Sequence, residues 1–357
     1  MKLLHAADLH LDSPFRQLTA AQAAQRRGEL RQIPARLARL AREEKVDLVL
    51  LPGDLFDAER VYPETIRALA DALGGIPSPV FIAPGNHDFY HAASPYDTTL
   101  WPENVHIFTS AALTGVPLPT LNCVVHGCAF TAPRREDDPL AGFSAPRDGR
   151  LHLLCLHGEV SAPGGLYAPL SPQSLADSGA HYAALGHIHT CTGLQWAGAV
   201  PWAYPGCPEG RGFDECGEKG ALVLTLNDGR VQAQFHPLCR RQYHIRSVDV
   251  SHFAQSLEQC PPEDLVRWIL TGESTDPPNL TALAALASAR CFYAEVRDET
   301  TLPQDLWARR KEDSLTGLFL REMGRRLDEA SPEQRPQLLL ATRFGLAALE
   351  GGEDIRP

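Results

Sequence analysis

The sequence lacks any long uninterrupted apolar run. A membrane-spanning helix needs roughly 18 or more such residues, and no stretch of the 357 residues approaches that length. The start, MKLLHAADLHL, is interrupted by His and Asp too early for a secretory signal peptide. We therefore expect a cytoplasmic protein with no membrane partner.

Paired cysteines are also lacking. The chain has nine cysteines, an odd number scattered singly without a Cys-x-x-Cys pair, whereas structural zinc sites usually draw their thiolates from such pairs. We expect reduced thiols with structural roles. The sequence shows no internal repeat and no low-complexity tract, so duplication does not explain its length.

A broadly basic surface is excluded as well, because the formal net charge is −11. Neutralisation of phosphates dominates nucleic-acid binding by basic proteins. Any contact with nucleic acid must therefore be local, assisted by metal ions or shared with a partner.

A composition of 44% hydrophobic and 22% charged residues is ordinary for a globular chain. The length of 357 residues predicts two or three structural units.

The first part of the chain alternates short apolar runs with helical patterns, which is typical of an α/β domain. Leu30, Ile33, Leu37 and Leu40 form an amphipathic helical stripe, although Pro34 leaves the start of that helix open. A second helix is predicted over 63–73. Buried strands are predicted at 2–7, 46–51, 79–83, 151–156 and 182–185.

The pattern changes after about residue 240. Strands are predicted at 243–250, 265–270 and 291–296, with helices at 253–259 and 280–288. The sequence therefore predicts a large domain over 1–240, a small α+β domain over 241–300 and a helical segment over 301–357. A second apolar stretch at 338–349 makes the last segment a helical hairpin, whose first helix has an apolar face comprising Leu315, Leu318, Phe319, Met323 and Leu327.

Polar clusters directly follow five predicted strands of the first domain. In open α/β sheets the crevice beyond the carboxyl ends of the strands is where ligands bind, so clusters distant in sequence can converge there. An isolated Asp-x-His or Gly-Asp pair is more often a turn, but five such clusters have no shared packing explanation. Their polar residues are Asp8, His10, Asp54, Asn86, His87, Asp88, His157, His187 and His189.

These residue types suit two divalent metal ions. Two like-charged ions held close together repel each other unless an anionic ligand lies between them, and Asp54 is the candidate bridge. Asp8, His10 and His189 would complete one site. The second would take Asn86, His157 and His187. A ligand set without thiolate suits catalytic manganese, iron or zinc, and we expect Mn²⁺.

Phosphate ester hydrolysis also needs a proton donor for the leaving group. Water activated between the ions would attack phosphorus, and His87 is adjacent to a ligand without being needed as one. We expect His87 to be the general acid and Asp88 to orient or electrostatically support its imidazole.

The ordered blocks D-x-H, GD, GNH[DE], H and GHxH resemble the calcineurin-like metallophosphoesterase superfamily. They match Asp8 with His10, Asp54, Asn86 to Asp88, His157, and His187 with His189 over about residues 1–240. The resemblance implies a four-layer α/β/β/α sandwich and the metal roles given above.

Four stretches resemble the DNA-repair exonuclease branch, which includes SbcD and Mre-type nucleases, and most closely its YhaO-type members. They are HAADLHLDSPF, GDLFD, LYAPLSPQSLADSGAHYAALGHIH and YPGCPEGRGFDECGEKG. The resemblance implies a capping domain over about 241–300, DNA as substrate and an SbcC/Rad-type coiled-coil ATPase partner. A homodimer is a second assembly to test. Mre-type nucleases carry a His three residues after the bridging Asp, whereas this chain has Asp57, so a second catalytic imidazole is not carried over.

Three functions stay open at this point. The leading one is a metal-dependent DNA exonuclease or endonuclease. The others are a phosphatase or cyclic-nucleotide phosphodiesterase, and a non-enzymatic scaffold for a coiled-coil ATPase.

The roles of two surfaces stay open as well. The apolar face at 315–327 either docks a partner or packs on its own domain. A series of arginines either contacts DNA or forms a solvated helix face. The arginines are Arg26, Arg27, Arg31, Arg36, Arg39 and Arg42.

Overall fold

The structure is a computed structural model that describes residues 1–57, 61–160, 164–227 and 229–349. The chain divides into two compact units, Met1–Gln242 and Tyr243–Pro357. The 241–300 and 301–357 segments therefore both fall almost wholly in the second unit, and residues 350–357 lie outside the described ranges. Each unit is described by itself below.

The first unit contains a six-stranded sheet in the order β12-β11-β1-β2-β3-β4. Four neighbouring strands are parallel, and β11 runs antiparallel to β1. Leu4 pairs with Val49 in the parallel register, and both are buried. The strands are β1 (Lys2–His5), β2 (Leu48–Leu51), β3 (Val80–Ile82), β4 (Val105–Ile107), β11 (Gly220–Asn227) and β12 (Arg230–Pro237).

A second six-stranded sheet has the order β5-β6-β7-β8-β10-β9. Its four central strands are parallel, and the strand at each edge is antiparallel to its neighbour. The strands are β5 (Thr114–Leu118), β6 (Cys123–Gly127), β7 (Leu151–His157), β8 (Tyr182–Gly186), β9 (Gln195–Ala197) and β10 (Val200–Ala203).

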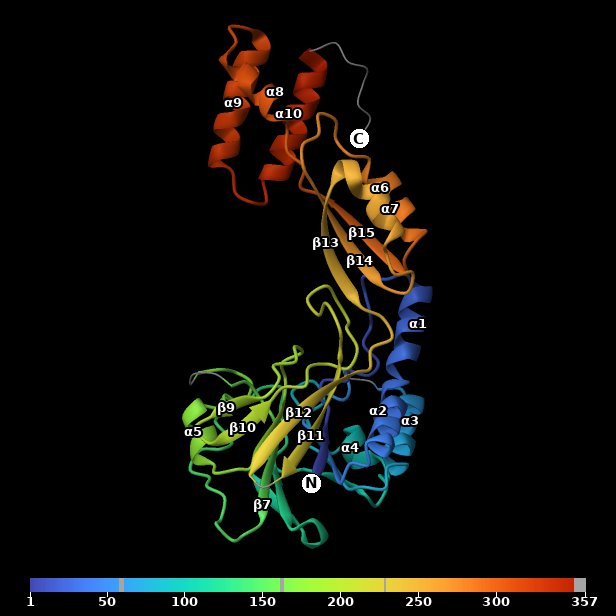
Figure 1. The fold of residues 1–357 in the computed structure, drawn as a ribbon, viewed down its shortest axis with the longest axis vertical. Helices are drawn as coiled ribbons and strands as arrows, with labels where there is room; N and C mark the ends of the chain where they lie inside the picture. The colour runs from blue at the N-terminus through green and yellow to red at the C-terminus, as the bar shows by residue number, and fades with distance from the viewer. Residues whose placement is uncertain (58–60, 161–163, 228, 350–357) are drawn as a thin grey trace. The chain divides into compact units, whose positions relative to one another are not determined.

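The two sheets pack face to face. One buried cluster joins Leu3 and Leu50 of the first sheet to Leu153 and Tyr182 of the second. The outer face of the second sheet packs against Leu175 of α5, while α2 and α3 lie alongside the first (Figure 1). The predicted α/β class and four-layer order are confirmed. The helices are α1 (Ala20–Leu30), α2 (Ile33–Glu43), α3 (Pro63–Gly74), α4 (Pro95–Thr98), η1 (Pro119–Leu121) and α5 (Pro172–Asp177).

The stripe from Leu30 to Leu40 belongs to two helices rather than one. Leu30 ends α1, and α2 begins at Ile33 with Pro34 in its first turn, where the missing N–H of proline costs no hydrogen bond. All four apolar residues are nevertheless buried. The helical period was therefore predicted correctly, but the break was missed.

The arginine series does not form one surface. Arg26 is fully buried and donates hydrogen bonds to Glu29 (2.6 Å) and Glu209 (2.9 Å), so both surface interpretations are wrong for this residue. Arg31 is bound to Asp12 at 3.0 Å. The exposed members are Arg39 and Arg42.

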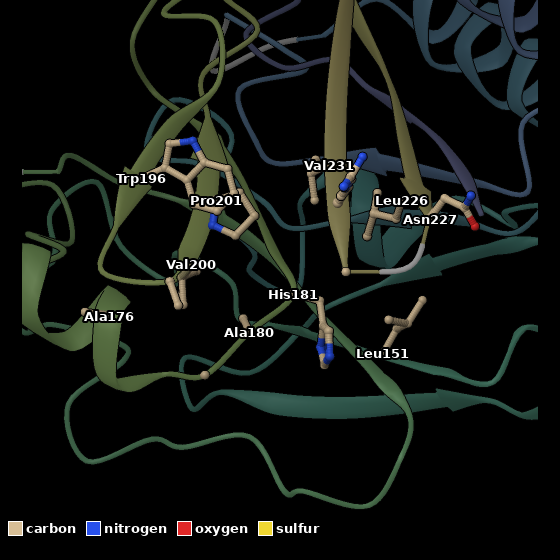
Figure 2. Close-up of a pocket in the computed structure, with 14 residues that line it drawn as sticks. Leu151, Ala176, Ala180, His181, Trp196, Val200, Pro201, Leu226, Asn227 and Val231 are labelled. Carbon is tan, nitrogen blue, oxygen red and sulfur yellow. The ribbon is translucent and has the colours of Figure 1, made fainter.

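An apolar pocket of about 350 Å³ lies at the starts of β7 and β8 (Figure 2). Leu151, the first residue of β7, lines it together with Trp196, Val200 and Leu226. His157 is the last residue of the same strand. The pocket is therefore at the opposite end of the sheet from the histidines that the sequence singles out.

The second unit combines strands and helices as expected, and its three strands are all parallel in the order β13-β14-β15. Helices connect them, and Trp268 is buried in their shared core with Phe253 and Leu257. The elements are β13 (Tyr243–Asp249), η2 (Val250–His252), α6 (Phe253–Glu258), β14 (Leu265–Thr271), α7 (Leu280–Ser288) and β15 (Tyr293–Asp298).

The predicted helical hairpin is confirmed by α9 (Leu315–Glu329) and α10 (Arg335–Leu349), which contact each other after α8 (Gln304–Ala308) and η3 (Arg309–Lys311). The buried side of α9 carries Leu320, Met323 and Leu327. Leu315 and Leu318 are instead 67% and 57% exposed. Among the described residues, no helix has the length and apolar character that crossing a membrane requires.

Candidate metal centre

The structure brings the polar clusters together at the carboxyl ends of the parallel strands. Asp8 and His10 follow β1, Asp54 follows β2, and Asn86 to Asp88 follow β3. His157 ends β7, and the His187–His189 segment follows β8. Because the two sheets are stacked, residues from both contribute to one cluster.

One part of the cluster contains Asp8, His10 and His189. One ligand atom from each of the three lies within 4.8 Å of those from the other two. The Nε2 atoms of His10 and His189 are 3.1 Å apart, and Nε2 of His189 is 3.9 Å from Oδ1 of Asp8. These are the three residues predicted for the first metal site.

The other part contains Asp54, His157 and His187, whose ligand atoms also lie within 4.8 Å of one another. Nε2 of His157 is 2.9 Å from Oδ1 of Asn86 and 3.4 Å from Oδ2 of Asp54. The same Oδ2 atom is 3.8 Å from Nε2 of His10. Asp54 therefore lies between the two parts, where a shared ligand is expected.

Backbone strain is concentrated at these residues. Asp8, His10, Asp54 and His187 have φ values of 54°, 44°, 51° and 113°, a region that residues other than glycine seldom occupy. Such strain persists only where the surrounding structure enforces it, and it clusters at functional sites. Here it turns the chain sharply at the strand ends, so that consecutive polar side chains can point to the same place.

Two glycines allow the close approach of the loops. A Cβ atom on Gly85 would overlap the carboxylate of Asp54, and a Cβ atom on Gly186 would overlap the backbone oxygen of Pro52. The glycines of the GNHD and GHIH blocks are therefore required for space, since any side chain would push the clusters apart.

The hydrogen bonds of three imidazoles indicate their tautomers. Nδ1 of His157 contacts the carbonyl oxygen of Pro52 at 3.0 Å. Nδ1 of His10 contacts Asp57 at 3.2 Å, and Nδ1 of His189 contacts Glu215 at 2.7 Å. A carbonyl and an ionised carboxylate only accept, so each Nδ1 donates a proton and each neutral ring presents the lone pair of Nε2.

The Nε2 atoms of His10 and His189 face each other and the carboxylates of Asp54 and Asp8. Nε2 of His157 faces the oxygen atoms of Asn86 and Asp54. Groups that only accept hydrogen bonds repel one another when packed together, and a cation between them removes that repulsion. Neutral imidazoles whose opposite nitrogen is bound to a carboxylate or carbonyl are the usual form of histidine metal ligands. The residues therefore fit divalent metal ions.

Electrostatics favour neutral rings at His10 and His187 but a protonated ring at His157. Burial lowers the pKa of His10 and that of His187 to about 4, which favours neutral rings. Burial raises the pKa of Asp8 to about 6. Burial opposes charge on His157 too, but the carboxylates of Asp54 and Asp8 raise its pKa to about 9. A proton on His157 neutralises part of the negative charge of Asp54 and Asp8, which a bound metal ion would otherwise neutralise.

His87 lies at the rim of the cluster, but its carboxylate partner is not the expected one. Nδ1 of His87 is 3.0 Å from Oδ1 of Asp57. Asp88 accepts backbone hydrogen bonds from Leu55 (2.7 Å) and Gly85 (2.7 Å). Asp88 therefore links the loop after β2 to the loop after β3. Its carboxylate accepts from backbone N–H groups that the strand ends leave unpaired.

Sequence reasoning gave no role to three residues that support the cluster. Asp57 contacts His10 and His87, Glu215 contacts His189, and Arg211 contacts both carboxylates. Asp57 lies in the GDLFD block, where the sequence indicated only that it replaces the histidine of Mre-type nucleases. The two other residues lie in YPGCPEGRGFDECGEKG, which stood out for its resemblance alone.

Comparison with known proteins agrees with this geometry. Residues 1–191 of the chain match the calcineurin-like phosphoesterase family. It is 30% identical over 266 residues to an uncharacterized metallophosphoesterase, YhaO, from Bacillus subtilis. It is also 30% identical over 275 residues to the DNA double-strand break repair protein Mre11 from Aeropyrum pernix.

Both alignments cover 70% of this chain and 64% of the relative, so the chain matches less than two thirds of the length of either. Among solved structures, it resembles TT1561 of Thermus thermophilus with a TM-score of 0.40 and 12% identity, over 66% of this chain and 98% of the other. The match over residues 1–191 spans more than half of the 357 residues. The chain therefore belongs to the calcineurin-like phosphoesterase family.

Proposed function

We propose that the chain is a two-metal phosphodiesterase that hydrolyses DNA. The observation that carries the metal-dependent chemistry is the convergence of three histidine Nε2 atoms on Asp8, Asp54 and Asn86. The first ion would be held by Asp8, His10 and His189 and the second by Asn86, His157 and His187. Asp54 would be shared between them.

When bound, two divalent ions would activate water for attack on phosphorus and stabilise charge on the phosphoryl oxygens. The protein supplies the proton for the leaving oxygen. The hydrogen bond that Nδ1 of His87 donates to the carboxylate of Asp57 raises the pKa of His87. With Nδ1 held by Asp57, the other ring nitrogen is free to donate that proton, which is how a general acid works.

DNA as the substrate is supported by two observations. A relative at 30% identity carries the name of a DNA double-strand break repair protein. The side chain of His87 is 46% exposed, so a long substrate can reach the proton donor. The net charge of −11 requires these phosphate contacts to be local.

The first test uses the full chain, depleted of metal and then supplied with Mn²⁺. We expect cleavage of single- or double-stranded DNA that chelation abolishes and Mn²⁺ restores. Asp54→Asn removes the shared negative charge and should lower activity about 10³-fold or more, which corresponds to about 4 kcal/mol of transition-state stabilisation. Asp328→Asn, an exposed aspartate of α9, is the matched control and should keep wild-type activity.

Substrate class is tested with the same preparation on a chromogenic phosphodiester, a phosphomonoester and DNA. Activity on both small esters without activity on DNA would replace the proposed nuclease with a phosphatase or small-substrate phosphodiesterase. Absence of hydrolysis of all three with Mn²⁺, Fe²⁺ or Zn²⁺ would contradict the proposed function altogether.

A further inference from the structure

Arg211 joins the two carboxylates behind one half of the candidate metal centre. Its Nη2 atom donates to Oε1 of Glu215 at 2.8 Å, and its Nη1 atom is 3.4 Å from Oδ2 of Asp57. Glu215 and Asp57 are the acceptors for Nδ1 of His189 and His10. The guanidinium thus lies behind both imidazoles that would hold the first ion.

The hydrogen-bond geometry at His189 shows that Glu215, which Arg211 holds in place, selects the ligating form. Both Glu215 (2.7 Å) and Nη2 of Arg211 (3.0 Å) approach Nδ1 of His189. A proton on Nδ1 is compatible with the carboxylate but not with a bond donated by the guanidinium. The shorter contact to Glu215 therefore places the proton on Nδ1 and leaves the lone pair of Nε2 directed at the cluster.

The segment that carries Arg211 is firmly anchored. Glu209 accepts hydrogen bonds from the buried Arg26 (2.9 Å) and from the backbone N–H of Arg240 (2.6 Å). Arg26 also donates to the carbonyl oxygen of Gly210 at 2.8 Å. Oε2 of Glu215 accepts from the backbone N–H of Arg211 at 2.7 Å. Arg211 is thus held from both sides of its own position in the chain.

Arginine suits this position better than lysine. A guanidinium presents several donors in a rigid plane and can bind two carboxylates at once, whereas an ammonium group is a flexible point charge. The side chain is only 18% exposed, so solvent screens these charge contacts weakly. Arg211 and Glu215 also lie beyond residues 1–191, the part matched by the family.

We propose that Arg211 is a positioning residue that fixes His10 and His189 through Asp57 and Glu215 and thereby sets the affinity of the first metal site. This inference rests on the proposed function, since it presupposes that the cluster binds two ions. Arg211 itself is neither a ligand nor a proton donor. It acts by keeping two Nε2 atoms 3.1 Å apart before an ion arrives.

The test is titration of the metal-depleted full chain with Mn²⁺, followed by calorimetry and electron paramagnetic resonance. For wild type we expect two bound ions and the spectrum of a spin-coupled pair. For Arg211→Gln we expect one site weakened by roughly 10- to 100-fold, together with the spectrum of isolated Mn²⁺ at one equivalent. Arg211→Lys should restore part of the affinity because it retains the charge but reaches only one carboxylate.

Arg230→Gln, at an exposed arginine that begins β12, is the matched control and should bind two ions as wild type does. If Arg211→Gln loses thermal stability, Glu215→Gln provides the second variant. It keeps the shape of the side chain but removes the charge, and a smaller loss at the same site is expected. Two unchanged sites in both variants would overturn the role of Arg211 while leaving the proposed function intact. Absence of Mn²⁺ binding by wild type would overturn the proposed function itself.

Discussion

Two histidine clusters lie at opposite ends of the second sheet, and β7 contributes one residue to each. His157 ends the strand within the candidate metal centre, and His152 lies near its start. Both side chains are buried, with exposures of 2% and 1%. Their different surroundings show what distinguishes a candidate metal site from a group of packed histidines.

The histidines near the start of β7 are linked by hydrogen bonds in which each donor has an acceptor within the cluster. Nε2 of His152 donates to Asp148 at 3.0 Å, so its Nδ1 is free to accept from Nε2 of His126 at 2.9 Å. The backbone N–H of His152 donates to Nδ1 of His181 at 3.0 Å. Each of these donors meets an acceptor, and Asp148 is the carboxylate that completes the chain. This arrangement requires no cation, in contrast to the acceptors that converge around Asp54.

The largest effect that separates the two clusters is expected from loss of the proton donor. His87→Gln should lower turnover by roughly 10²- to 10⁴-fold while both Mn²⁺ ions still bind. His181→Gln, in the other cluster, should leave turnover unchanged. The measurement is steady-state hydrolysis of a phosphodiester, with bound Mn²⁺ determined on the same samples. Equal loss in both variants would remove the functional distinction between the clusters.

A smaller effect is expected from the carboxylates that orient each cluster. Asp57→Asn weakens the acceptor for His10 and His87, and we expect Mn²⁺ affinity to fall by roughly 10- to 100-fold. Asp148→Asn makes the equivalent change beside His152 and should not alter Mn²⁺ binding. Calorimetric titration of both variants checks the prediction, which is contradicted if Asp57→Asn binds Mn²⁺ like wild type.

The smallest effect concerns pH and the cluster at the start of β7. Burial, with His152 and Arg150 nearby, lowers the pKa of His126 to about 4. The unfolded chain has the ordinary value of about 6.5, so it binds more protons than the folded chain between these pH values. The stability contribution is therefore present at pH 7 and is lost as the pH falls towards 4.

Between pH 7 and pH 5 this residue should account for about 1–2 kcal/mol of lost stability. His126→Gln removes the titrating group and should make the stability of the first unit less dependent on pH by that amount. Hydrogen exchange of the β7 amides in metal-depleted full chain measures it. An identical pH dependence in wild type and variant would show that His126 does not contribute.

The candidate site was far more predictable than the sheets that hold it. Asp8, His10, Asp54 and the later blocks carry their chemistry in short motifs, which follow compact apolar runs. The edge strands β4, β5, β9 and β12 were missed because much of each is exposed to solvent and each lacks a long apolar run. The strands β6, β10 and β11 were missed too, although they are largely buried, so the prediction of the sheets was incomplete. The break before α2 was missed because its apolar period continues across two helices.

The supporting contacts could not be predicted in the same way. Asp57 and Arg211 are 154 residues apart in the chain, and His189 and Glu215 are 26 apart. No local pattern pairs one charged residue with another over such distances. The same limit explains why Asp88 was assigned to His87: it is the neighbour in sequence, whereas Asp57 is the neighbour in space.

By itself the sequence determined the residue types of a candidate metal centre, their order and the α/β scaffold, because strand ends and ligand spacing are local properties. The tertiary structure decided which nitrogen of each imidazole faces the cluster, since that depends on what the opposite nitrogen contacts. It also decided the partner of His152, which shares a strand with His157 but donates to Asp148. The direction in which an imidazole lone pair points depends on the residues packed around the ring. So does the number of carboxylates near it, and only the fold brings those residues together.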